Sequence, residues 1–281
     1  MTRIAPAPTS SLPSVPAQPR RRRGGGIAVV WPPLAVFVAI LAAWSLASGL
    51  LGDQSFLLPA PYRIFTEGLL DPLVLPEIVE ALGQTVLVAF TGLAIAVVIG
   101  VGWAIVMLQA KWAERSLYPY AVILQCIPIL ALVPLIGFWF GYGLPARVIV
   151  CVLISLFPMV SNTLFGLQSV DRSQRELFQL QRAGRWTTLW KLQLPQALPA
   201  MFVGLRTSAG LSIVGAIVGD YFFRRGTPGL GSLMSTYTSR LLAPELYASV
   251  IVAALLGVAI FVAFGLLSRL AVGRWYDEAK A

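Results

Sequence analysis

The sequence predicts an all-α integral membrane protein with six transmembrane helices and a short cytoplasmic helix between the fourth and the fifth. Hydrophobic residues make up 57% of its 281 positions, and the mean hydropathy is +0.79. Only 12% of the residues are charged, about half of the ~25% typical of a soluble domain. A soluble protein of this size needs a polar surface that so few charges do not supply, so the chain belongs in a lipid bilayer.

Six stretches are long and apolar enough to cross the hydrocarbon core, which takes about 20 residues as a helix. The expected helices lie near residues 27–51, 84–108, 119–140, 148–167, 194–219 and 246–268. The fifth carries one charge, Arg206, and Pro128, Pro134 and Pro158 fall inside the third and fourth. Proline is tolerated in a membrane helix where neighbours satisfy the freed carbonyl, and it often marks a bend. We expect residues 27–275 to form one transmembrane domain.

The two ends of the chain have little apolar surface to bury. Residues 1–26 are rich in Pro, Ala and Ser and end in Arg20–Arg23 and three glycines. Because such a segment does not offset its ordering entropy, we expect a disordered basic tail there and a short tail at 276–281. The charge-free stretch after Arg23 exceeds the ~7–15 residues of a signal peptide, which favours a retained anchor. Arginines beside a membrane helix set orientation or contact anionic lipid, so lipid is expected as a partner and nucleic acid is not.

The distribution of Lys and Arg predicts the orientation. If the N-terminal tail is cytoplasmic, the inner segments hold 15 of the 21 Lys and Arg residues. The outer connection at 52–83 has only Arg63 but five acidic residues. Since Lys and Arg favour cytoplasmic loops, both termini are expected in the cytoplasm of a multi-pass cell-membrane protein.

Several kinds of chemistry are excluded. The chain has no His, no G-x-x-x-x-G-K-[ST], no C-x-x-C and no G-x-S-x-G, so it offers no P-loop for ATP, no zinc motif and no nucleophile elbow. Cys126 and Cys151 lie in apolar stretches and are expected to be small buried hydrophobes. We therefore expect no catalytic residues, no metal and no cofactor.

The connection at 168–196 is too long for a tight turn and has a helical apolar pattern. Leu177, Leu180 and Gly184 follow i, i+3 and i+7, and an apolar stripe of Trp186, Leu189, Trp190 and Leu192 continues it. This pattern predicts a short amphipathic helix at the cytoplasmic face. It would rest on lipid headgroups or insert into a groove on a soluble partner.

Residues Glu176–Pro199 resemble the EAA loop of the permease subunits of ABC importers. In that family a Glu-Ala-Ala start is followed nineteen residues later by the Pro of a Leu-Pro pair, and here Pro195 stands nineteen residues after Glu176. Leu177 and Phe178 replace the two alanines, and Arg182 takes the usual Gly position. The resemblance implies that this loop contacts the ATPase through Glu176, Leu177, Phe178, Gln179, Leu180, Arg182, Ala183, Gly184 and Arg185.

Four further stretches resemble the nitrate, sulfonate and taurine importer permeases of the same family. They are Leu57–Pro61, Pro128–Gly143, Phe157–Thr163 and Gly219–Gly231, in which Asp220 stands where many members have Glu. The resemblance implies two ATPase subunits, an extracytoplasmic solute-binding protein that meets the outer loops, and a second permease copy, as a homodimer or with a close paralogue. It implies import of a small solute of the nitrate, sulfonate, taurine or aromatic vitamin-precursor class, and the Arg185–Leu192 run favours the organic-nutrient branch.

Four polar residues in or near the spans are candidates for the solute pathway: Gln125, Asn162, Arg206 and Asp220. Each has a structural alternative. Amides at membrane depth often bond between helices, Arg206 could snorkel near the cytoplasmic end of its span, and Asp220 could be an interfacial carboxylate near the outer end of the same helix. A rival function is a stand-alone secondary transporter or channel, which predicts inverted repeats and buried carboxylates. An integral membrane enzyme would need clustered acids or nucleophiles, which the sequence does not bring together.

Overall fold

The computed structural model describes residues 26–51 and 57–277, and every regular element in these ranges is helical. The chain divides into two units, residues 1–46 and 47–281. The described part of the first unit lies in α1 (Gly26–Leu50), whose residues Trp31–Leu50 are apolar enough to cross a membrane. The tails expected at 1–26 and 276–281 lie outside the described residues, except that α1 includes Gly26 and α11 includes residues 276 and 277.

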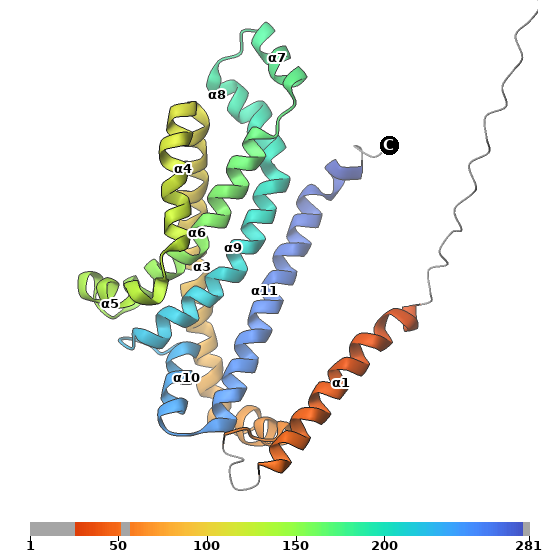
Figure 1. Cartoon of the computed structure of the whole chain (residues 1–281), viewed down its shortest axis with the longest axis vertical. Helices are drawn as coiled ribbons and strands as arrows, with labels where there is room; N and C mark the ends of the chain where they lie inside the picture. The colour runs from red at the N-terminus through yellow and green to blue at the C-terminus, as the bar shows by residue number, and fades with distance from the viewer. Residues whose placement is uncertain (1–25, 52–56, 278–281) are drawn as a thin grey trace, which may run out of the picture. The chain divides into compact units, whose positions relative to one another are not determined.

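Four long helices form the bundle of the second unit (Figure 1). They are α3 (Val74–Gln109), α6 (Leu144–Gln168), α9 (Leu194–Phe222) and α11 (Ala243–Asp277). The contact between α6 and α9 is the most extensive, while α3 packs on both and α11 packs on α9. Two short helices, α7 (Arg172–Leu180) and α8 (Arg185–Thr188), lie at one end of this bundle, followed by the π-helical turn η3 (Leu189–Gln193). At the other end lie α2 (Pro61–Arg63), η2 (Ile64–Leu69) and α10 (Leu230–Ser239).

Small residues let α6 and α9 approach closely. A Cβ atom added to Gly215 would lie 2.7 Å from the Cα of Cys151, and one on Gly219 would lie 3.1 Å from the Cα of Arg147. The hydroxyl of Ser208 on α9 donates to the carbonyl of Ser155 on α6 at 2.7 Å. Because lipid removes the usual hydrophobic drive for association, small-residue contacts and interhelical hydrogen bonds of this kind hold membrane helices together.

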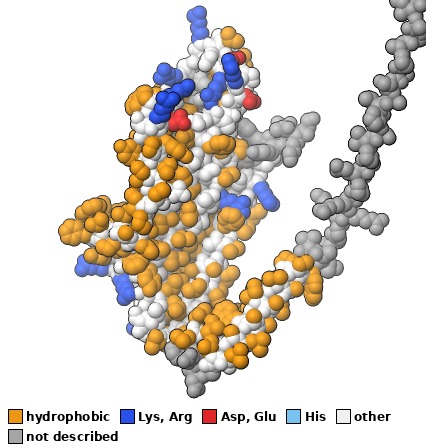
Figure 2. Space-filling model, in the orientation of Figure 1, with side chains coloured by type: hydrophobic (Ala, Val, Ile, Leu, Met, Phe, Trp, Pro, Cys, Tyr) orange, Lys and Arg blue, Asp and Glu red, His pale blue; other side chains and the backbone are white. Residues whose placement is uncertain are grey.

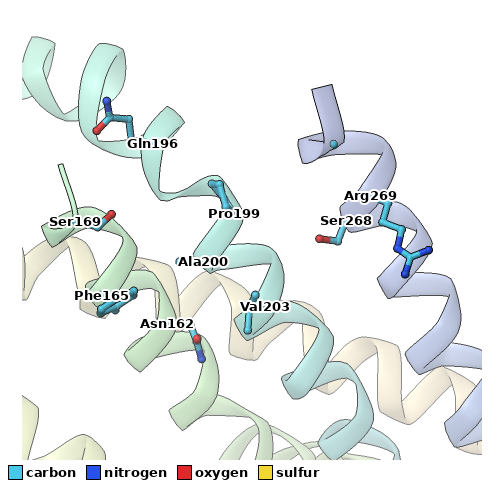
Figure 3. Close-up of a pocket in the computed structure, with 10 residues that line it drawn as sticks. Asn162, Phe165, Ser169, Gln196, Pro199, Ala200, Val203, Ser268 and Arg269 are labelled. Carbon is cyan, nitrogen blue, oxygen red and sulfur yellow. The ribbon is translucent and has the colours of Figure 1, made fainter. Parts of the chain in front are cut away.

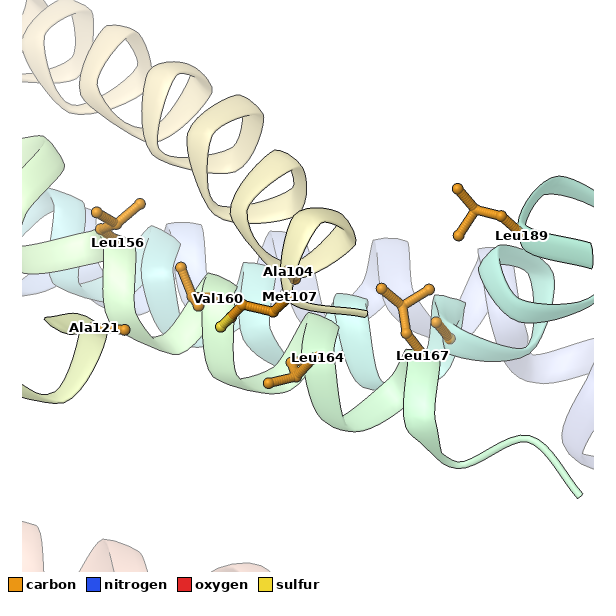
Figure 4. Packing of buried hydrophobic residues seen from close by; sticks show 9 residues of the cluster. Ala104, Met107, Ala121, Leu156, Val160, Leu164, Leu167 and Leu189 are labelled. Atoms are coloured by element: carbon orange, nitrogen blue, oxygen red, sulfur yellow. The ribbon is translucent and has the colours of Figure 1, made fainter. Parts of the chain in front are cut away.

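An apolar cluster packs the segment that follows α8 against the ends of α3 and α6 (Figure 4). Met107 of α3, Leu164 and Leu167 of α6 and Leu189 of η3 are all buried in it. Helices α8, η3 and α9 form one continuous helical segment from Arg185 to Phe222. The fifth expected span, 194–219, therefore lies within a longer helical segment.

The expected third span, 119–140, is not a single helix. Helix α4 (Lys111–Cys126) ends before Pro128, and α5 (Ile129–Phe140) leaves at 97° to it. Pro128 has no N–H, so the carbonyl of Leu124 loses its helical partner, and the residue before proline is driven out of the helical region; Ile127 is accordingly extended. Five helices of the described chain are long and apolar enough to cross a membrane, or six if the bent pair counts as one span.

Other helix bounds differ from expectation for one reason. Helix α3 begins at Val74 rather than near residue 84, and α11 runs from Ala243 to Asp277 rather than over 246–268. The expectation stopped at charges such as Glu80, whereas a helix continues past the hydrocarbon wherever its backbone bonds remain intact. The visible face of the bundle is mostly hydrophobic, and Lys and Arg gather over the end that carries α7 and α8 (Figure 2).

Candidate functional site

Helix α7 carries the first part of the loop that the sequence predicts to contact the ATPase, and it projects from the bundle (Figure 1). None of its residues is buried, Phe178 is half-buried, and Leu177 and Leu180 are exposed, the latter by 82%. Glu176 is exposed and lies 2.8 Å from Arg172 in an i, i+4 ion pair, which on a surface contributes ~0.3–0.5 kcal/mol. The helix thus presents apolar side chains beside a carboxylate on an unpartnered surface.

Arg182 ends α7 in the left-handed conformation that glycine usually supplies. Its φ is +51°, and its N–H donates to the carbonyl of Gln179 at 2.9 Å, while the N–H of Ala183 donates to Phe178 at 3.0 Å. These two bonds form a Schellman motif, with Arg182 at the position after the C-cap. The sharp bend after α7 is therefore present although the usual Gly is replaced, and Gly184 itself has an extended conformation.

We expect Arg182→Gly to raise stability by about 0.5–1 kcal/mol, because a side chain in the left-handed region costs roughly 1–2 kcal/mol and glycine gives back part of this as unfolded-state entropy. Arg182→Val should destabilise the bend, since β-branched residues are outliers there. Thermal unfolding in detergent, compared with Gln181→Gly at the preceding position of ordinary φ, measures the effect. A glycine at 182 that destabilises as much as one at 181 would contradict this assignment.

The second half of the loop is anchored in the bundle. Leu189 and Leu192 are buried, and Leu189 belongs to the cluster with α3 and α6. The side chain of Gln196 on α9 hydrogen-bonds to that of Gln174 on α7. Thus α7 itself is exposed, while the segment that follows it is packed in the bundle and one side-chain hydrogen bond joins α7 to α9.

The four candidate pathway residues do not meet in one cavity. Gln125 is exposed and lines a cavity of about 340 Å³ beside α6 and α9. Asn162 lines another, of about 660 Å³, between α6, α9 and α11, and its Nδ2 donates to the carbonyl of Pro158 at 2.8 Å. In this second cavity Asn162 and Ser268 project from facing helices, whereas Arg269 points away (Figure 3).

Arg206 lies against α11. Its guanidinium carbon stands 3.7 Å from the centroid of the Phe261 ring, a cation–π arrangement that offsets part of the cost of a charge in a span. A Cβ atom on Gly265 would come within 3.2 Å of the guanidinium, so the glycine makes room for it. The placement is that of a packed side chain between two helices.

Asp220 forms a buried ion pair with Arg147, a residue that the sequence analysis missed. Arg147 Nη1 lies 2.7 Å from Asp220 Oδ1, and the two side chains are only 3% and 2% exposed. Arg147 also donates to the carbonyls of Phe223, Arg225 and Thr227 at 2.8–2.9 Å. The signal available in the sequence was an Arg one residue before a charge-free span and an opposite charge near the end of another.

This pair holds the connection between α9 and α10 in place. The N–H of Ser232 donates to Asp220 Oδ2 at 2.6 Å, and the N–H of Leu230 donates to the hydroxyl of Thr85 on α3 at 2.9 Å. On α10, the Tyr237 hydroxyl donates to Glu77 at 3.0 Å; burial, followed by this hydrogen bond, raises the pKa of Tyr237. The α10 end of the bundle is therefore held together by a buried ion pair and by hydrogen bonds among α9, α3 and α10.

Within the described ranges, no group of three or more Asp, Glu or Cys side chains is placed to hold a metal ion. The features that the described residues do form are a buried ion pair, an exposed helix with apolar side chains, and cavities between helices.

Comparison with known proteins finds a matching family and several similar sequences. Residues 96–275 match a protein family described as binding-protein-dependent transport system inner membrane component. The formylaminopyrimidine transport permease protein ThiX of Halalkalibacterium halodurans is 31% identical over 85% of this chain and 93% of its own. The riboflavin transport system permease protein RibX of Chloroflexus aurantiacus is 32% identical over 87% and 91%. The putative aliphatic sulfonates transport permease protein SsuC of Escherichia coli is 29% identical over 85% and 89%.

The fold is shared with solved transporters. A chain of the MetNI methionine ABC transporter, in an inward-facing conformation, aligns with a TM-score of 0.56 at 17% identity, over 74% of this chain and 95% of its own. A chain of an amino acid ABC transporter aligns with a TM-score of 0.55 at 20% identity, over 71% and 94%.

Proposed function

This chain belongs to the family of inner membrane components of binding-protein-dependent transport systems, the permease subunits of ABC importers, and we propose that α7 is the contact through which separate ATPase subunits drive it. Family membership decides against the rival of a stand-alone transporter or channel. The sequence lacks a P-loop, so the energy of ATP hydrolysis has to enter through a partner contact. Homologues named as transport permeases fit a chain without catalysis of its own.

The observation that carries the proposal is the exposure of apolar side chains on a short helix that precedes a segment packed in the bundle. Leu177 and Leu180 face outward on α7, a pattern that suits a helix lying in a hydrophobic groove. Glu176 sits beside them on the same exposed surface, where it can pair with a basic group of the ATPase. The anchor of Leu189 in the α3–α6 cluster links α7 to the spans.

We expect Leu180→Asp and Phe178→Asp to release the ATPase while leaving the permease folded, because truncating or charging a buried anchor costs about 2–4 kcal/mol. Glu176→Arg should weaken association less and uncouple hydrolysis from uptake. Co-purification with the ATPase and uptake in reconstituted vesicles measure both, with formylaminopyrimidine and riboflavin as the first solutes. Ser173→Asp, exposed on the same helix, is the matched control. Wild-type association and uptake in the three variants would reduce α7 to a surface helix.

We further propose six spans, with α4 and α5 together as the third, and both termini in the cytoplasm. The gathering of Lys and Arg over the α7–α8 end supports this orientation (Figure 2), since basic residues favour the cytoplasmic side. The fixed outer surface around the α9–α10 connection is then the docking site for a solute-binding protein.

Cysteine labelling should confirm the orientation. In a Cys126→Ala background, an impermeant maleimide added outside should react with Leu73→Cys and spare Ser173→Cys; both positions are exposed. Permeabilised membranes provide the control, because both should then react. The reverse pattern would invert the topology.

A second permease copy is proposed to cover α5. Helix α4 has 16 residues, about 24 Å at 1.5 Å per residue, so it ends before crossing the ~30 Å hydrocarbon core. The chain then turns by 97° and leaves exposed, non-helical backbone at Pro128. Because such backbone is not tolerated against lipid, protein or a water-filled path has to meet it, and two copies around a twofold axis supply both.

The solute class is proposed from the relatives. Two relatives that are more than 30% identical carry the names of formylaminopyrimidine and riboflavin transport permeases. We place this chain with importers of heterocyclic organic nutrients, and an uptake preference for aliphatic sulfonates or nitrate would overturn that placement.

A further inference from the structure

Another cavity, distinct from those lined by Gln125 and Asn162, lies at the α7 end of the bundle and has the composition of an anion site. It has a volume of about 320 Å³ and lies where α7 and α8 meet the last residues of α3. Its polar lining consists of Arg175, Arg185, Gln109, Gln179, Gln193 and Thr188. Guanidinium groups only donate hydrogen bonds, while amides and hydroxyls can donate as well as accept. The lining therefore suits a multiply charged oxyanion.

The charge of this cavity is not balanced by the described residues. Arg175 and Arg185 both line it, and no carboxylate of the described chain does. Glu176, the acid next to Arg175 in sequence, is bound to Arg172 instead. Arg175 is half-buried and Arg185 is exposed, so the cavity presents two cations to whatever enters it, and guanidinium groups match the geometry of phosphoryl oxygens.

Arg175 is already positioned for a ligand. Its Nη2 donates to the carbonyls of Leu167 and Gln168 at 3.4 and 3.1 Å, which fixes the side chain at the end of α6. Its Nε is buried and has no hydrogen-bond partner among the residues that the structure describes. A buried donor without a partner is costly and calls for an acceptor.

The segment that lines this cavity has the composition of a membrane–water interface. Trp186 and Trp190, which belong to the same segment as Arg185 and Thr188, are exposed, and tryptophan concentrates at that interface. Leu189 and Leu192, on the opposite face of the same segment, are buried in apolar packing. Basic pockets between helices on the cytoplasmic side bind anionic headgroups.

We propose that this cavity binds a phosphoryl anion, supplied by the headgroup of an anionic lipid or by free phosphate, and that the bound anion braces α7 against α3. That the brace matters for transport rests on the proposed function of α7, whereas the binding of the anion does not. An anion held by Arg175 of α7 and Arg185 of α8 would tie together the two sides of the bend at Arg182.

The test measures binding on the full-length permease without its ATPase. Native mass spectrometry of protein released from nanodiscs counts the phosphatidylglycerol retained against phosphatidylcholine. In a separate arm, inorganic phosphate is added to the protein in a sulfate-free buffer, with chloride as the reference anion at the same ionic strength, and the unfolding temperature is measured. Retained phosphatidylglycerol without a phosphate effect identifies a lipid site; a saturable rise in unfolding temperature identifies free phosphate.

Arg185→Gln should lower the affinity about tenfold, the loss of one charged hydrogen-bond donor, and Arg175→Gln with Arg185→Gln should abolish binding. Because Arg175 also caps α6, the single Arg185→Gln variant keeps the test valid if the double variant does not fold. Arg115→Gln is the matched control, since Arg115 is exposed near the α3–α4 end and lies outside this cavity. Equal binding by wild type and Arg185→Gln, or an equal loss in Arg115→Gln, would refute the site.

The same variants separate this inference from the proposed function. If α7 couples to the ATPase but the cavity binds no anion, Leu180→Asp releases the ATPase while Arg185→Gln retains wild-type phosphatidylglycerol. If the cavity binds an anion but α7 does not couple, Arg185→Gln loses the lipid while uptake is unchanged in Leu180→Asp.

Discussion

Asp220→Leu should destabilise the permease by about 3–5 kcal/mol, because it leaves Arg147 as a buried cation without its carboxylate. Both side chains are almost fully buried at 2.7 Å from each other. The carboxylate also accepts the N–H of Ser232 at 2.6 Å, so the first turn of α10 loses its partner together with Arg147. We expect little folded protein by size-exclusion chromatography and a large drop in unfolding temperature.

The matched control is an ion pair of similar length at the surface. Arg63 and Glu67 lie 2.8 Å apart in α2 and η2 and are both partly exposed. Glu67→Leu should therefore cost less than 1 kcal/mol. The double variant Arg147→Met with Asp220→Leu should recover part of the loss, since removing both charges is less costly than isolating one. If Asp220→Leu is no worse than Glu67→Leu, the pair is not a structural clamp.

The sequence predicted the parts of the fold that depend on hydropathy alone. The apolar stretches around residues 84–108, 148–167 and 194–219 all lie within helices, because an apolar segment in lipid has few alternatives to a helix. The break between α4 and α5 was not predicted, since a count of apolar residues over 119–140 does not register where the backbone turns. Pro128 was named only together with Pro134 and Pro158 as prolines of a kind that often mark bends, and nothing in the sequence indicated the 97° angle found there.

The site was predictable where local spacing determines it. The amphipathic pattern of Leu177 and Leu180 predicted a short helix at the cytoplasmic face, and in the structure both residues lie exposed on α7. The pairing of Arg147 with Asp220 joins two helices far apart in the sequence, so no local pattern reveals it. Asp220 was considered as a pathway residue because its charge was known and its partner was not.

The α5 surface should prove essential for assembly of the permease pair. Phe138 is 81% exposed on α5, and buried aromatic anchors contribute about 2–4 kcal/mol to an interface. Phe138→Ala with Trp139→Ala is therefore expected to weaken the proposed dimer about 30- to 1,000-fold. If this surface faced lipid instead, the same change would have little effect on association, because acyl chains replace the lost contacts.

Exposure alone does not distinguish these two surroundings, so the control is an equally apolar position on another helix. Val258 of α11 is 61% exposed, and Val258→Ala should leave the dimer intact. In a Cys126→Ala background, Phe138→Cys should form a disulfide-linked dimer in membranes, whereas Val258→Cys should remain monomeric, since the proposed dimer places α5 at the twofold axis of an isologous contact. Crosslinking at Val258 with none at Phe138 would move the interface to α11 and leave the exposed backbone at Pro128 to be covered by a different partner.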